Sequence, residues 1–261
     1  MRMAGAAGAA AVGGLALTDP ALAQGSKWVG GRDLSGWTST VGDGVWAAAG
    51  EAPVSRGDLA MEHNRTLTTL RANVDRRAVM AHNLAYNRVQ NLDSMSAIQK
   101  ANVEFRLPDI PATDNWEYNA QTLEAALFVW DGPNTRLDYG MAIQWVLNPW
   151  LPNFGALRAW QQTDGGAPQW VDVAYLEPDT EWHSLQMDFR ATSNLSRLTI
   201  DGNRIDVDKT FTVKDRYWGN TIDGRFQLEI ISVWPGPNSE VPAHAAEFRN
   251  WAWRQPDTSR F

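Results

Sequence analysis

Short segments in which apolar and polar residues alternate constrain this chain more than any other feature of its sequence. Clusters of Gly, Pro, Asn and Asp recur about every ten to fifteen residues, and the segments between them alternate more often than they repeat at helical spacing. Asp201 and Gly202 form a hairpin turn between two such segments, because Asp-Gly supplies the positive φ that these turns require. One loosely periodic segment, between Thr66 and Gln99, is where a helix is expected. The pattern predicts an all-β protein.

Ten segments are expected to be strands, and no repeat or low-complexity linker divides them into separate domains. They are residues 102–107, 123–129, 139–147, 157–161, 170–175, 182–190, 198–200, 204–207, 226–233 and 246–253.

Composition excludes several classes of function. The 261 residues include no Cys and carry a formal net charge of −7 without a run of basic residues, which excludes disulfides and thiolate zinc sites and disfavours nucleic-acid binding. The 4 His form no metal-binding pair, and Gly-rich phosphate loops and Gly-x-Ser-x-Gly motifs are missing from the sequence. No cofactor is expected. Asp131, Asn134 and Asp138 form an oxygen-rich cluster that suits a structural Ca²⁺, but turn geometry explains them equally well.

The N-terminal segment is typical of an export signal. Residues 1–23 are small and apolar, and they end in Ala21-Leu22-Ala23, which fits the small-x-small rule of signal peptidase. We expect cleavage before Gln24, a single domain over 24–261, and a secreted or periplasmic protein. The segment is similar to the end of a twin-arginine signal, while a retained Ala/Gly leader is the alternative. No stretch of about 18 apolar residues predicts a membrane span.

Three motifs carry a resemblance to a known superfamily. Residues 30–37 read GGRDLSGW, residues 181–185 read EWHSL before a strand and an Asp-Gly turn, and residues 246–251 read AEFRNW after the apolar segment 226–230. This set resembles the concanavalin A-like lectins and glucanases, and is nearest to the bacterial 3-keto-disaccharide hydrolase-like family. The resemblance implies a two-sheet antiparallel jelly-roll sandwich whose concave face binds a carbohydrate or glycoside. The Glu-x-Asp-x-x-Glu strand of the retaining glucanases is not found in the sequence, which argues against their mechanism.

Two glutamates are the candidates for glycoside hydrolysis, which needs a pair of carboxyl groups on either side of the scissile bond. Glu104 lies on the polar face of its segment beside Arg106, and Glu124 shares a face with Trp130. The competing interpretation makes Glu104 and Arg106 solvated neighbours and Glu124 the start of a strand. The pair is tenable only if both glutamates face one groove within about 10 Å of each other.

A lyase reaction needs instead a base and groups that stabilise a developing negative charge. His82 and Tyr86 are candidates for the base, with Arg106, Gln144 and Arg158 as the stabilising groups. By contrast, His183 alternates with apolar residues and is interpreted as a core histidine.

The chain contains 14 Trp against 8 Phe and 5 Tyr, an excess that favours flat platforms for sugar rings. Trp130, Trp145 and Trp160 are the candidates for substrate binding. We therefore expect an exported protein that cleaves a glycosidic bond in its carbohydrate ligand, as a hydrolase or a lyase. A non-catalytic lectin-like module is one alternative, and a cyclase or isomerase with an apolar β cup is another. An open cleft lined by Trp and Arg would favour a polysaccharide, and a closed apolar cavity the cyclase.

Overall fold

The computed structural model describes residues 26–74, 77–92, 99–110, 120–131, 139–149, 151–162, 168–190, 195–205, 207, 222–234 and 244–256. Within them every element is a β-strand, apart from the single 3-10 turn η2 (Arg56–Asp58). None of these residues belongs to a helix long and apolar enough to cross a membrane. The expected signal, 1–23, lies outside the described residues, so export stays a prediction.

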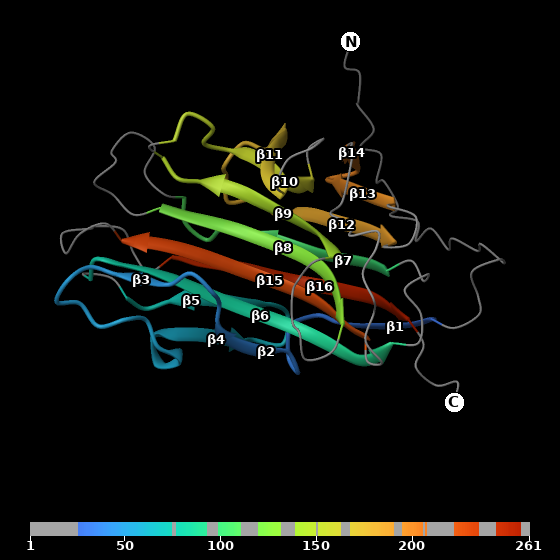
Figure 1. The fold of residues 1–261 in the computed structure, drawn as a ribbon, viewed down its shortest axis with the longest axis horizontal. Helices are drawn as coiled ribbons and strands as arrows, with labels where there is room; N and C mark the ends of the chain where they lie inside the picture. Colours follow the sequence, from blue (N-terminus) through green and yellow to red (C-terminus); the bar gives the residue numbers. More distant parts are fainter. Residues whose placement is uncertain are drawn as a thin grey trace, which may run out of the picture.

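Two antiparallel sheets of eight strands each are stacked as layers (Figure 1). Sheet A runs in the order β14 (Asn203–Ile205), β13 (Leu195–Ile200), β12 (His183–Arg190), β7 (Gln99–Arg106), β16 (Ala245–Pro256), β5 (Thr68–Ala72) and β4 (Leu59–His63), and β1 (Ser26–Gly31) also pairs with β16. Sheet B runs in the order β11 (Pro168–Tyr175), β10 (Ala156–Gln162), β9 (Tyr139–Leu147), β8 (Ala120–Asp131), β15 (Ile222–Trp234), β6 (Val79–Leu92) and β2 (Thr38–Val41), and β3 (Trp46–Ala47) also pairs with β6. The predicted sandwich is confirmed, and each of the ten expected strands is present.

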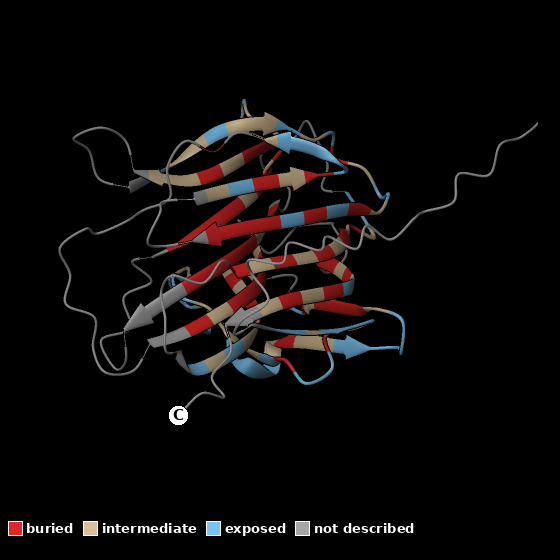
Figure 2. Ribbon diagram, turned by 90° about the vertical axis from the view of Figure 1, so that its right-hand side faces the viewer, coloured by how far each residue is buried: buried red, intermediate tan, exposed pale blue. Residues whose placement is uncertain are grey.

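Alternation along each strand separates the core from the two outer faces. On β7, Val103 and Phe105 are 2% and 1% exposed, whereas Glu104 between them is partly exposed. On β8, Leu123 joins the same core cluster, so Glu124 points to the outer face of sheet B. Figure 2 shows the buried residues following the central strands of both layers.

The expected helix between Thr66 and Gln99 is wrong. The described part of that segment forms the strands β5 and β6. On β6, Ala81 and Ala85 are fully buried against the core, while His82 points to the opposite face. Burial with a period of two therefore outweighs the weak helical spacing of the Leu and Val residues.

His183 is buried, as the sequence predicts. Its Nδ1 lies 2.7 Å from an oxygen of Asp201, and its Nε2 lies 2.9 Å from an oxygen of Asp179. The ring packs against those of Phe105 and Trp145, at centroid distances of 5.5 and 5.7 Å. Asp201, which has a φ of 49°, lies in the turn between β13 and β14. Its contact with His183 therefore ties this hairpin to β12.

The inward and outward positions of β7 make a direct test of this packing. We expect Phe105→Ala to lower the free energy of unfolding by about 3–5 kcal/mol, because it leaves a cavity in the core. Arg106→Ala removes a partly exposed ion pair with Glu247 and should cost about 1 kcal/mol. Urea unfolding measures both. Equal losses would contradict the assignment of the two faces.

Candidate functional site

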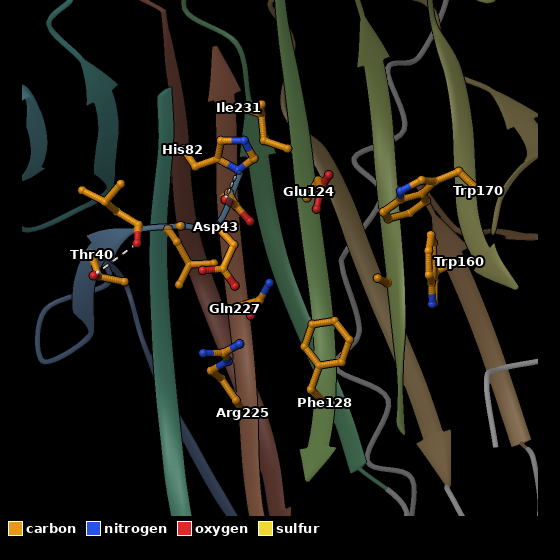
Figure 3. A pocket seen from close by; sticks show the side chains of 15 residues that line it. Thr40, Asp43, His82, Glu124, Phe128, Trp160, Trp170, Arg225, Gln227 and Ile231 are labelled. Atoms are coloured by element: carbon orange, nitrogen blue, oxygen red, sulfur yellow. Dashed lines mark hydrogen bonds and ion pairs between the residues drawn. The ribbon is translucent and has the colours of Figure 1, made fainter. Parts of the chain in front are cut away.

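A cavity of about 460 Å³ lies on the outer face of sheet B, and we call it the cleft. β6, β15 and β8 form its floor, β2 and the loop after it form one wall, and β9, β10 and β11 supply the other. Figure 3 shows Glu124 near the centre, with His82 and Asp43 on one side and Trp160 and Trp170 on the other. The volume is within the range of about 300–1,000 Å³ that is typical of small-molecule sites.

Strand register brings two carboxyl groups together on the floor. Glu124 on β8 is directly opposite Glu229 on β15, and side chains so paired have Cβ atoms about 4.5–5.5 Å apart. Each carboxyl has a partner on a further strand. Gln144 Nε2 donates to Glu124 Oε1 at 2.6 Å, and His82 Nδ1 lies 2.9 Å from Glu229 Oε1.

The environment of Glu124 keeps it protonated at neutral pH. Burial in the cleft floor, and then the negative charge of Glu229, raise the pKa of Glu124 to about 8. The hydrogen bond from Gln144 works in the opposite direction and is the weakest of the three effects. The floor therefore presents a carboxylic acid beside a carboxylate, which is the combination that acid–base and nucleophilic catalysis use.

Two tryptophans form an aromatic wall at the other end of the cleft. The rings of Trp160 and Trp170 meet edge to face, with centroids 5.4 Å apart, and they pack against Phe128. Arg158 lies beside this wall, on the same face of β10 as Trp160. Its guanidinium donates to the Trp170 carbonyl oxygen at 3.2 Å and lies 3.1 Å from Asp172. The two indoles therefore pack on each other and on Phe128, and Arg158 ties down the backbone at Trp170.

Arg225 brings a permanent positive charge to the cleft. Its guanidinium lies 5.3 Å from the centroid of the Tyr86 ring, at cation–π distance. Burial lowers the pKa of Arg225, but a guanidinium stays protonated in proteins. Tyr86 lies on the cleft face of β6, next to Arg225 rather than on the cavity wall.

The structure brings most of the sequence-predicted site residues to one face. Those on the cleft face of sheet B are His82, Tyr86, Glu124, Gln144, Arg158 and Trp160. Their roles stay predictions. Trp130 lies on β8, opposite Asp223, but its side chain is outside the described part. Asn134 and Asp138 of the expected calcium cluster are also outside it, so that site stays untested.

Glu104 does not belong to this site, so the predicted pair of Glu104 and Glu124 is wrong. Glu104 lies on the outer face of sheet A, and the core of the sandwich separates it from the cleft. Its carboxylate accepts hydrogen bonds from Arg249 at 2.6 Å and Asn250 at 3.0 Å. Asn250, with a φ of 51°, sits where the register of β16 shifts, so Glu104 stabilises that irregular segment.

Arg106 and Trp145 are also misplaced by the sequence reasoning. Arg106 shares the outer face of sheet A with Glu104, where it pairs with Glu247 and lies over the Trp182 ring. Trp145 is 1% exposed within the core, and its indole N–H donates to the Leu176 carbonyl oxygen at 3.1 Å. Trp145 shares the inward face of β9 with Ile143 and Leu147, and the number of Trp residues in a sequence does not show which face each of them occupies.

Sequence reasoning missed several residues of the cleft. Glu229, Arg225 and Gln227 alternate along a segment that is otherwise apolar, which was the signal available. Trp170 is visible in the sequence only as the start of a strand, and Asp43 only as a turn residue. Neither shows its position in the cleft without the strand order.

No family model matches the sequence, and no curated protein matches it. Among solved structures, the chain is similar to a winged bean acidic lectin in complex with methyl-α-D-galactose. The TM-score is 0.50 at 9% identity, and the match covers 88% of this chain and 98% of the lectin. This match and the two stacked antiparallel sheets decide the fold. The fold is that of the concanavalin A-like lectins and glucanases.

The chain is also similar to other solved structures, at lower TM-scores. A β-glucanase of Bacillus licheniformis has a TM-score of 0.47 at 12% identity, covering 89% of this chain and 99% of that one. A sialidase has a TM-score of 0.47 at 12% identity over 85% of this chain, which spans 17% of the sialidase. The nearer resemblance to the 3-keto-disaccharide hydrolase-like family stays a prediction.

The raised pKa of Glu124 predicts a dependence of stability on pH. Between pH 4.5 and about 8 the folded protein keeps a proton on Glu124 that the unfolded chain releases. The stabilisation is complete below this window and is lost as pH rises through it, by at most about 1.4 kcal/mol per pH unit. The free energy of unfolding of the wild type minus that of Glu124→Gln should therefore fall with rising pH in this window.

A second variant sharpens the measurement. Glu229→Gln removes the neighbouring charge, which lowers the pKa of Glu124 and moves the upper limit of the window to lower pH. Urea titrations at a series of pH values give the difference curves. A wild-type curve that runs parallel to that of Glu124→Gln throughout the window would contradict the proton assignment.

Proposed function

We propose that the cleft binds a carbohydrate and hydrolyses a glycosidic bond in it. The observation that supports this is the protonated Glu124 beside the carboxylate of Glu229 on the cleft floor. Retaining glycosidases use two carboxyl groups about 5–5.5 Å apart, and directly opposed residues on neighbouring strands have Cβ atoms at a similar separation, about 4.5–5.5 Å. Glu229 is therefore the proposed nucleophile, and Glu124 the proposed acid and base.

The proposed reaction has two steps. Glu124 gives its proton to the leaving oxygen while a carboxylate oxygen of Glu229 attacks the anomeric carbon, so that one C–O bond breaks and another forms. Water then attacks the same carbon, Glu124 takes back a proton, and the bond to Glu229 breaks. His82 holds one oxygen of Glu229 at 2.9 Å, which orients the other oxygen for attack.

The walls of the cleft support a sugar as the ligand. Trp160 and Trp170 offer half-buried indole rings that are already fixed in position. Preorganised aromatic surfaces bind rigid rings at a low cost in conformational entropy. The winged bean lectin, which has the same fold, is described in complex with a galactoside. The polar floor, with Glu124, Glu229 and Arg225, disfavours the alternative of a dry cup for an apolar metabolite.

Activity on a glycan panel tests this function. Purified protein is incubated with cello-, laminari-, manno-, xylo- and galacto-oligosaccharides, and new reducing ends are measured. We expect cleavage of at least one neutral series, with kcat reduced about 10²–10⁴-fold in Glu124→Gln because the proton donor is lost. Glu229→Gln should lose turnover by at least as much, since the covalent step then has no nucleophile.

The matched control is Glu104→Gln, which changes a glutamate of sheet A on the opposite face of the sandwich. It should retain wild-type turnover. Full activity in Glu124→Gln would overturn the proposed acid. Binding to the panel without any cleavage would overturn hydrolysis and favour the lectin-like alternative.

A further inference from the structure

The loop between β2 and β3 is a bulge that rises over the cleft. β2 and β3 both pair with β6, through Val41 opposite Asn83 and Trp46 opposite Met80. Residues 42–45 therefore lie opposite residues 81–82, so the segment between β2 and β3 contains two more residues than the facing segment of β6. An insertion in one strand of a pair bends that strand out of the ladder.

Glycines allow the bulge to press against the catalytic floor. A β-carbon at Gly42 would collide with Oε1 of Glu229 and lie 3.0 Å from Cβ of His82. The Gly42 N–H donates to the His82 carbonyl oxygen at 3.0 Å, which anchors the bulge. Gly44 has a φ of 83°, and a β-carbon there would lie 3.6 Å from His82 Nε2. The backbone of the bulge is thus fixed on the pair formed by His82 and Glu229.

Asp43 lies between these two glycines and lines the cleft. Figure 3 shows its carboxylate directed over the floor, between His82 and Arg225. The positive charge of Arg225 interacts electrostatically with this carboxylate, and the hydrogen bonds found among the described residues do not include one to it. A fixed backbone therefore presents an acceptor whose lone pairs are available to a ligand in the cleft.

We propose that Asp43 binds two hydroxyl groups of an uncharged sugar ring, and that it makes the cleft select neutral glycans over uronates. This inference rests on the proposed function and names the substrate class of the same site. The hydroxyls donate to the two carboxylate oxygens, as charge-assisted hydrogen bonds. Asp43 is then a specificity-determining residue that touches the substrate.

The charges of the cleft support exclusion of uronates. Asp43 and Glu229 both place negative charge beside the position of the bound ring, and like charges in a desolvated site disfavour binding. Two cationic candidates line the cleft, His82 and Arg225. His82 is engaged by Glu229, and the Arg225 guanidinium lies by the Tyr86 ring and interacts electrostatically with Glu229 and Asp43, so the acids of the cleft already balance both cations. A uronate carboxylate in the centre of the cleft would therefore face the two acids.

The test compares one oligosaccharide in two charge states. A neutral hexose series that the wild type cleaves is also oxidised at C6 to the matching uronate, and both forms are given to wild type, Asp43→Asn and Asp43→Ala. On the neutral form, Asp43→Ala should raise KM about 10- to 100-fold with little change in kcat, because hydrogen bonds to a charged group are lost. Asp43→Asn should fall between, since its amide retains one acceptor oxygen.

Charge selectivity is the second readout. The wild type should prefer the neutral form, and Asp43→Asn should reduce this preference at least several-fold by admitting the oxidised form. The control is Glu62→Gln, which neutralises an exposed carboxylate on β4 of sheet A and should change neither value. Thermal melting of all variants should match that of the wild type, which separates loss of binding from loss of fold.

Failure of this inference differs from failure of the proposed function. Equal kcat/KM on neutral and oxidised forms, or an unchanged KM in Asp43→Ala, would overturn the role of Asp43 while hydrolysis stands. If the wild type cleaves nothing, hydrolysis fails, and calorimetric binding of neutral and oxidised galacto-oligosaccharides tests Asp43 alone. Equal affinities for the two forms would then overturn it.

Discussion

The pairing of β8 with β15 is the constraint on which the rest of this site depends. Their register puts Glu124 directly opposite Glu229 on the cleft face of sheet B, while the residues on either side of each are buried in the core. Two carboxyl groups held this close on a buried floor cannot ionise independently, and burial together with the charge of Glu229 keeps Glu124 protonated. The same packing that stabilises the sandwich therefore creates a proton donor beside a carboxylate.

Different elements surround the pair of Glu124 and Glu229 on its two sides. The indoles of Trp160 and Trp170 form a rigid apolar wall, and the bulge that carries Asp43 closes the opposite side. Because strands supply the floor and wall, the positions of these groups are set by register rather than by loop conformation. The bulge departs from the ladder, and its glycines let it lie against Glu229 and His82. The proposed selection of substrate is thus placed on an irregular element.

The resemblance to the concanavalin A-like lectins and glucanases predicted the sandwich, and alternation in the sequence predicted the strands. Alternation could not predict which face of which sheet a polar residue occupies, because Glu104 and Glu124 follow the same local pattern on different sheets. Strand order, set by contacts far apart in the chain, decides that Glu124 meets Glu229. The same limit applies to Trp145, which lies in the core because it is on the inward face of β9. The helix expected before Gln99 failed because tertiary burial outweighed a weak local period.

The protonation state of Glu124 is the central claim, and it can be measured directly. Carbon-detected NMR of protein labelled at the glutamate carboxyl carbons follows each carboxyl through a pH titration. We expect one resonance to titrate near pH 8, to be missing in Glu124→Gln, and to move to lower pH in Glu229→Gln. A Glu124 carboxyl that titrates near its ordinary value of 4.5 in the wild type would contradict the account.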